Sequence, residues 1–201
     1  MNKRPGLLVV FSGPSGSGKG TVLKEAMKMS DNLTISVSVT TRKPRCGEVD
    51  GVDYIFYSKE QFTDLIDKDG FLEWACFCEN YYGTPKERVE ALLSEGKDVI
   101  LEIEVQGAMK IKEVCPDAVL IFNMPPSSDE LKNRLVGRNT DTADVIKKRL
   151  ETAVWEISQA ERYDYIVVND QVDRAVKSFL SIIEGEKCKP DRNKDILAEY
   201  R

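Results

Sequence analysis

The chain has 201 residues, enough for one domain with a sizeable core, and its 41% hydrophobic and 31% charged residues are typical of a folded globular protein rather than a disordered one. A formal net charge of −5 argues against a general nucleic-acid binder, which needs a basic face. The complete lack of histidine excludes Ser-His-Asp and Cys-His nucleophilic catalysis and argues against a zinc site.

Strand and helix patterns alternate along most of the sequence. Short apolar runs predict buried strands at residues 7–11, 98–105, 118–124 and 165–168. Helical patterns begin at Thr21, at the capping box Ser58–Gln61 and at Thr84, with Pro85 at the first helical position, and follow again up to Val114 and over 127–137, 144–162 and 172–184. Residues 34–39, 54–57 and 71–77 are strand-like, and Asn80–Gly83 predicts a turn.

This order of elements predicts an α/β fold. Strands that alternate with helices form a mainly parallel sheet flanked by helices, here within a single domain over residues 1–201. Residues 34–77 depart from the alternation, since several strands follow one another with polar loops between them, and we expect a small inserted, mostly β lobe there. Ligands of such sheets bind outside the carboxyl ends of the strands.

A glycine-rich loop follows the first expected strand. The stretch FSGPSGSGKGT, residues 11–21, lies between a strand and a helix, which is the context of a phosphate-binding loop. Its glycines let backbone N–H groups approach an anion, the helix N-terminus adds partial positive charge, and Lys19 reaches the outer phosphates. The Ser or Thr that usually follows the lysine as a Mg²⁺ ligand is replaced by Gly20, with Thr21 one position later.

Three further groups of polar residues could be either ordinary solvent-exposed residues or parts of a functional site. Arg42 and Arg45 lie in a polar loop, which by composition alone is more simply a solvated basic loop. Glu73 lies between apolar neighbours, and alternation along a strand would turn it toward solvent. The last group lies in charge-rich helical segments, where ordinary surface ion pairs are common: Arg134, Arg138 and Arg149.

Together these segments resemble the guanylate kinase family. The phosphate loop, VSVTTRKPRCGEVDGVDYIF, FLEW, NYYGTP, LEIEVQG, RLVGR, KKRL and YDYIVVND occur in that family's order and spacing, over about residues 7–183. The resemblance implies a phosphotransferase with ATP as donor, GMP as acceptor, and ADP and GDP as products. It also implies a P-loop kinase core at about 1–33, 85–126 and 163–201, a GMP-binding lobe at about 34–84, and a helical lid at about 127–162.

The family's functional positions fall on particular residues of this chain. Those implied as catalytic are Lys19, Arg42, Arg134, Arg138 and Arg149. Those implied to bind the donor nucleotide are Gly13, Pro14, Ser15, Gly16, Ser17, Gly18, Lys19, Gly20, Thr21 and Asn169. The acceptor's phosphate falls to Arg42, Arg45, Tyr54 and Tyr82, and its guanine to Ser38, Glu73 and Thr84. A carboxylate at Glu73 suits the two adjacent N–H donors of guanine, which adenine does not present.

The expected metal is Mg²⁺, and its protein contacts depart from the family's pattern. Many members carry two Asp before the QG pair, where this chain has Glu102 and Glu104. Two apart on a strand, both side chains would point the same way. We assign Glu102 to Mg²⁺ through water and Glu104 to the guanine or ribose side.

Two other functions remain open from the sequence. A nucleoside-monophosphate kinase with another acceptor would share the phosphate loop and lid but gives no reason for Glu73 beside the Arg42 and Arg45 pair. A guanylate-kinase-like interaction module would keep the fold without catalysis, and such modules typically lack the intact loop and lysine found here. With no run of about 20 apolar residues and no secretion signal, we expect a cytoplasmic enzyme that meets small-molecule substrates and neither nucleic acid nor membrane.

Overall fold

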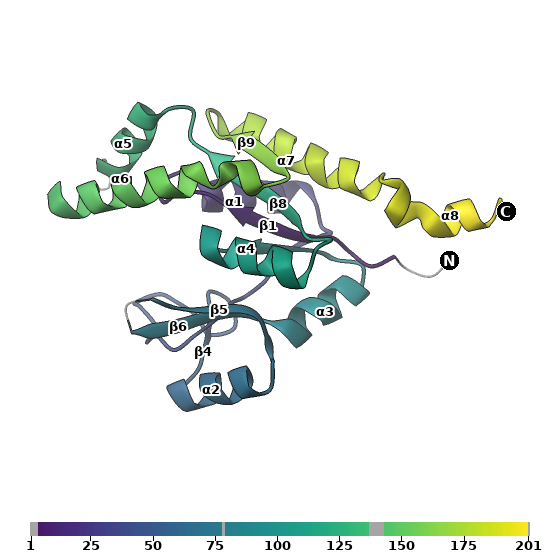
Figure 1. Ribbon diagram of the computed structural model, residues 1–201, viewed down its shortest axis with the longest axis horizontal. Helices are drawn as coiled ribbons and strands as arrows, with labels where there is room; N and C mark the ends of the chain where they lie inside the picture. The colour runs from purple at the N-terminus through teal and green to yellow at the C-terminus, as the bar shows by residue number, and fades with distance from the viewer. Residues whose placement is uncertain (1–3, 78, 137–142, 201) are drawn as a thin grey trace. The chain divides into compact units, whose positions relative to one another are not determined.

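The computed structural model describes residues 4–77, 79–136 and 143–200 (Figure 1). Its strands are β1 (Leu8–Ser12), β2 (Leu33–Ile35), β3 (Val39–Thr40), β4 (Ile55–Phe56), β5 (Phe71–Phe77), β6 (Asn80–Pro85), β7 (Asp98–Glu102), β8 (Val119–Met124) and β9 (Tyr165–Val168). Its α-helices are α1 (Lys19–Met29), α2 (Lys59–Asp67), α3 (Lys86–Ser94), α4 (Val105–Val114), α5 (Ser128–Val136), α6 (Ala143–Ser158), α7 (Val172–Lys187) and α8 (Lys194–Ala198).

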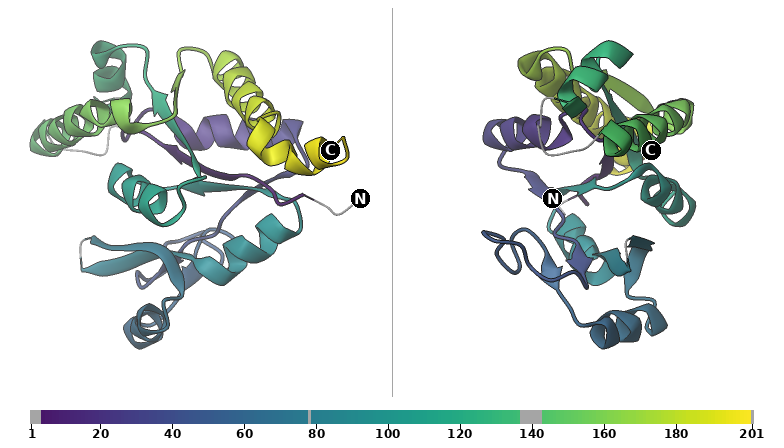
Figure 2. Two further views of the ribbon diagram at one scale, coloured as in Figure 1. Left: turned by 45° about the vertical axis from the view of Figure 1, so that its right-hand side comes forward. Right: turned by 90° about the vertical axis from the view of Figure 1, so that its left-hand side faces the viewer.

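The larger sheet has five strands in the order β2-β7-β1-β8-β9. The pairs β2–β7 and β8–β9 are parallel, and helices flank the sheet (Figure 2). All five residues of β1 are buried, as its continuous apolar run predicts. The expected mixed α/β fold with a parallel sheet flanked by helices is confirmed.

Clustering of contacts divides the chain into two compact units. The first comprises the residues up to Val10 together with Asn32–Ala118, and the second comprises Phe11–Asp31 together with the residues from Val119 onward. The division into core, lobe and lid expected from the sequence stays a prediction. Across the described ranges, no helix is both long and apolar enough to cross a bilayer.

The first unit contains the smaller sheet, with four strands in the order β4-β3-β6-β5. Helix α2 packs on it through Phe62, which is fully buried against Val39 and Phe71. The predicted capping box starts this helix: the Ser58 hydroxyl accepts from the Gln61 N–H, and the Gln61 side chain accepts from the Ser58 N–H. The smaller sheet and its polar loops are therefore supported by a separate small hydrophobic core that the sheet forms with α2.

The second unit is built on α1 and α7, which pack side by side (Figure 2). Phe11 of β1 and Phe179 of α7 meet edge to face, with ring centroids 5.0 Å apart. A separate apolar cluster of Leu131, Leu135 and Ala153 joins α5 to α6. This unit holds the glycine-rich loop.

Two element predictions were wrong. Asn80–Gly83 is not a turn but part of β6, which pairs with β5 from Phe77↔Asn80 onward. The reversal comes just before it, where Glu79 has a positive φ of 62°. The expected single strand over 34–39 is divided between two sheets: β2 pairs with β7, whereas β3 pairs with β4 and β6. Turn-like composition and local alternation do not contain these long-range pairings.

Candidate active site

The glycine-rich loop spans the six residues between β1 and α1. Gly13, Gly16 and Gly18 have φ values of 144°, 87° and 86°, in the region that side-chain-bearing residues rarely adopt. Gly13 also packs against the end of β8, because a Cβ added there would lie 2.2 Å from the Asn123 carbonyl oxygen. Helix α1 begins at Lys19, two residues earlier than predicted, so Gly20 and Thr21 belong to its first turn.

The Ser17 carbonyl in this loop accepts hydrogen bonds from three side chains. Asn123 and Asn169 donate their amides to it at 2.9 and 2.8 Å, and the Arg134 guanidinium donates at 3.3 Å. Both asparagines are buried. Because a trans peptide directs its N–H opposite to its C=O, this anchoring fixes the direction of the Gly18 N–H. Asn169 is the residue expected beside the donor's adenine. In the structure its side-chain amide stabilises the loop through the Ser17 carbonyl.

The cations predicted to act on phosphate are gathered around the same loop. Lys19 Nζ donates to the Gly13 and Pro14 carbonyls at 2.5 and 3.2 Å. Arg149 of α6 donates to the Ser15 hydroxyl at 2.7 Å. Besides Ser17, Arg134 contacts Glu130 and the Asn169 carbonyl, at 2.8 and 3.1 Å. Arg138 lies outside the described residues.

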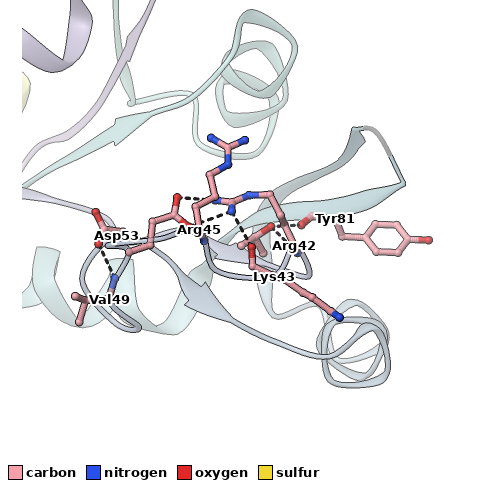
Figure 3. Close-up of polar contacts among 8 residues, drawn as sticks. Arg42, Lys43, Arg45, Val49, Asp53 and Tyr81 are labelled. Carbon is pink, nitrogen blue, oxygen red and sulfur yellow. Dashed lines mark hydrogen bonds and ion pairs between the residues drawn. The ribbon is translucent and has the colours of Figure 1, made fainter.

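The predicted acceptor-phosphate residues lie in the first unit, where Arg42 is held by a carboxylate. Its guanidinium donates to both oxygens of Glu48, at 3.0 and 2.8 Å, and to the Lys43 carbonyl at 2.8 Å (Figure 3). Glu48 also accepts the Arg45 backbone N–H at 2.7 Å. This pairing raises the pKa of Arg42 and lowers that of Glu48. The exposed Arg45 guanidinium extends away from the pair (Figure 3).

Two tyrosines predicted beside the acceptor's phosphate adjoin this arginine. The Arg42 guanidinium carbon lies 5.3 Å from the Tyr54 ring centroid, and the rings of Tyr54 and Tyr82 are 6.2 Å apart. Burial raises the pKa of Tyr54, so its hydroxyl stays protonated and can donate. Ser38, half-buried, precedes β3, and its carbonyl accepts from the Ile55 N–H at 2.9 Å.

Glu73 is buried, so the interpretation as a solvent-facing strand residue is wrong. Only 9% of it is exposed. Alternation along β5 holds here, but the buried face is the one that carries Phe71 and Glu73, whereas the apolar neighbour Trp74 is exposed. Thr84, directly opposite on β6, donates its hydroxyl to Glu73 Oε1 at 2.7 Å. Desolvation raises the pKa of this carboxyl, while the Thr84 hydroxyl acts in the opposite direction.

Glu102, expected to meet Mg²⁺ through water, and Glu104, expected on the guanine or ribose side, do not share a strand. Strand β7 ends at Glu102, and Glu104 is the residue that caps the N-terminus of α4. Both are exposed. Within the described ranges, no three carboxylate or thiol side chains come together as a metal cluster. An exposed carboxylate such as Glu102 would suit a Mg²⁺ that keeps most of its waters and binds mainly to phosphates.

Sequence reasoning missed two residues that organise these sites. Glu48 lies six positions from Arg42 in an irregular loop, and no periodic pattern relates the two. Asn123 is the penultimate residue of β8, whose other residues are apolar, and it is fully buried. A polar amide in a buried strand next to the carboxyl end was the signal available for Asn123, because buried polar groups require partners.

Comparison with known proteins agrees with this arrangement. The guanylate kinase family profile matches residues 6–186. A guanylate kinase of Caldanaerobacter subterraneus subsp. tengcongensis is 51% identical over 99% of this chain and 97% of its own length, and one of Bacillus cereus is 55% identical over 96% and 94%. The crystal structure of guanylate kinase from Anaplasma phagocytophilum superposes with a TM-score of 0.76 at 35% identity, covering 96% of this chain and 92% of that one. The chain belongs to the guanylate kinase family.

Proposed function

We propose that this protein transfers the terminal phosphoryl group of ATP to GMP, giving ADP and GDP. The observation that carries the choice of acceptor is the buried Glu73 carboxylate, fixed through one oxygen by Thr84. Guanine presents N1–H and an exocyclic amine side by side, and a carboxylate accepts from both. Family membership supports the same reaction.

The donor side of the proposed reaction belongs to the glycine-rich loop. Its backbone N–H groups and the N-terminus of α1 would receive the phosphates of ATP, and Lys19 would leave the loop carbonyls to pair with the outer phosphates. Arg134 and Arg149 would stabilise the charge on the transferring group, and we extend this role to Arg138 on the resemblance alone. The contacts of Arg134 and Arg149 with this loop support the assignment.

The acceptor side uses the first unit. Arg42, already oriented by Glu48, would bind the GMP phosphate together with Arg45, Tyr54 and Tyr82. Ser38, Thr84 and Glu104 would complete the contacts to guanine and ribose. Charged hydrogen bonds from arginine and neutral ones from tyrosine suit an acceptor phosphate that must be held in position while one of its oxygens attacks the terminal phosphorus of ATP and ADP leaves.

Mg²⁺ is part of the proposal as a companion of ATP. When bound, it would neutralise charge on the transferring phosphates. Glu102, exposed at the carboxyl end of β7, is the carboxylate we propose to contact it through water. Gly20 and Thr21 lie in the first turn of α1, where Gly20 offers no hydroxyl to the metal.

The competing functions make different demands on the chain. A guanylate-kinase-like interaction module has no need of Lys19 among three left-handed glycines, which are all in place here. A kinase for another nucleotide has no need of a buried carboxylate at position 73. We include a cytoplasmic location and small-molecule partners only in the proposal, and no oligomeric state.

Nucleotide-dependent thermal stability tests the acceptor directly. The protein would be melted alone and with saturating GMP, AMP, CMP or UMP, since a ligand that binds only the folded state raises the melting temperature. We expect selective stabilisation by GMP, and loss of that selectivity in Glu73→Gln. Equal shifts with GMP and AMP would contradict guanine recognition and favour a kinase with another acceptor.

A further inference from the structure

Gly107 is the third residue of α4, in the first turn of the helix, and lies against the carboxylate of Glu73. A Cβ added at this glycine would be 3.1 Å from Glu73 Oε2 and 3.4 Å from its Cδ. The other near atom is the side-chain Cδ1 of Ile103, at 3.3 Å. Because Oε1 is bound by Thr84, the position of Oε2 decides how the carboxylate faces a ligand.

The glycine is not explained by the helix itself. Gly107 is not among the residues with positive φ, so any amino acid could adopt its backbone conformation. Glycine in a helix interior is less stable than alanine because it loses more conformational freedom on folding. A carbon 3.1 Å from a carboxylate oxygen is closer than ordinary van der Waals contact, so alanine would displace the carboxylate. The close approach of Glu73 therefore accounts for the glycine.

We propose that Gly107 is a specificity-determining positioning residue: its lack of a side chain lets Glu73 Oε2 lie against α4, where the carboxylate faces guanine. Gly107 acts through Glu73 and need not touch the nucleotide. The inference rests on the proposed function, because it presupposes that Glu73 reads the base.

The test compares two Gly→Ala substitutions in helices. Gly107→Ala should lower kcat/KM for GMP several-fold, because the Glu73 carboxylate must shift by a few tenths of an ångström to make room for the Cβ. It should also narrow the preference for GMP over AMP while KM for ATP stays unchanged. Gly185→Ala is the matched control, since Gly185 lies in α7 and, apart from its own helical turn, no atom of the described residues lies within 4 Å of an added Cβ. That variant should keep all kinetic constants.

The Glu73→Ala background separates a local displacement from a general defect. There the carboxylate is gone, so adding Gly107→Ala should cost no further activity, and any loss of melting temperature in the single Gly107→Ala variant should disappear. Equal losses in both backgrounds would overturn the inference, as would Gly107→Ala behaving like Gly185→Ala.

The same experiments distinguish failure of the inference from failure of the proposed function. If Glu73→Gln leaves the GMP-to-AMP preference unchanged, Glu73 does not read the base. Both the proposed basis of guanine recognition and the proposed role of Gly107 are then wrong. If Glu73→Gln narrows the preference but Gly107→Ala does not, only the role of Gly107 is wrong.

Discussion

The ionisation of Glu73 links its burial to stability. Because burial raises the pKa of the folded carboxyl above that in the unfolded chain, the folded state holds the proton more tightly. The stabilisation is therefore full below the unfolded pKa and is lost as the pH rises through the folded pKa. Glu73→Gln removes this titration while keeping an oxygen for Thr84. The melting temperature of the variant minus that of the parent should increase from about pH 4 to pH 7.

A Glu73→Gln difference that stays flat over this pH range would mean that Glu73 is ionised as easily in the fold as in the unfolded chain, and would contradict its raised pKa.

Glu48 makes a second prediction at this scale, because it holds Arg42 through both guanidinium ends. Glu48→Gln removes the charge and one acceptor oxygen, so Arg42 loses its fixed orientation. KM for GMP should rise several-fold with KM for ATP unchanged. The control is Glu87→Gln, at an exposed glutamate in the first turn of α3, which should change neither KM. A lower KM for GMP would show instead that Glu48 competes with the phosphate for the arginine.

These two residues also show how far single positions can be predicted from sequence. Glu73 could be singled out as a charge among apolar neighbours, but its burial depends on which face of β5 packs inward, and that face carries Phe71 and Glu73. The partner of Arg42 could not be predicted, since the loop is shaped by side-chain bonds to backbone such as Asp53 to the Val49 N–H, at 2.8 Å (Figure 3). Residue types indicate which chemistry is available, whereas the path of the irregular backbone determines which side chains come into contact.

At the scale of elements, the phosphate loop depends on the end of β8. Asn123→Ala would remove two hydrogen bonds to Ser17, at 2.9 Å to its carbonyl and 3.1 Å to its hydroxyl. Loss of buried hydrogen bonds costs about 1–3 kcal/mol of unfolding free energy. A looser Ser17–Gly18 peptide should also raise KM for ATP, with KM for GMP unchanged.

Thermal melting and steady-state kinetics check this prediction against Asn133→Ala, an exposed asparagine on α5. The control should change neither property. If Asn123→Ala lowered stability but kept the parent KM for ATP, Asn123 would support the fold and not the direction of loop N–H groups.

Elements with a strong local pattern were predictable, and those defined by pairing were not. The phosphate loop between β1 and α1, the capping box of α2 and the strand β9 follow from periodicity and turn chemistry. The ends of β2 and β3 do not, because each pairs with a different sheet. The same holds for β6, where two tyrosines favour a strand within a turn-like sequence.

At the scale of the whole molecule, replacing Lys19 should reduce catalytic activity without reducing thermal stability. Its ammonium donates to the Gly13 and Pro14 carbonyls of the loop, and we propose that its charge pairs with phosphate. Lys19→Met should therefore leave the melting temperature within a few degrees of the parent and lower activity by orders of magnitude. Full activity in this variant would mean that the loop does not bind the donor.

The central claim is that the chain phosphorylates GMP with ATP, and product analysis tests it most directly. Purified protein would be incubated with ATP, Mg²⁺ and one of GMP, AMP, CMP or UMP, and all nucleotides separated and quantified. The account predicts equimolar ADP and GDP with GMP, little product with the other three acceptors, and none with Lys19→Met. ADP formation that does not depend on GMP, or equal diphosphate formation from AMP, would contradict it.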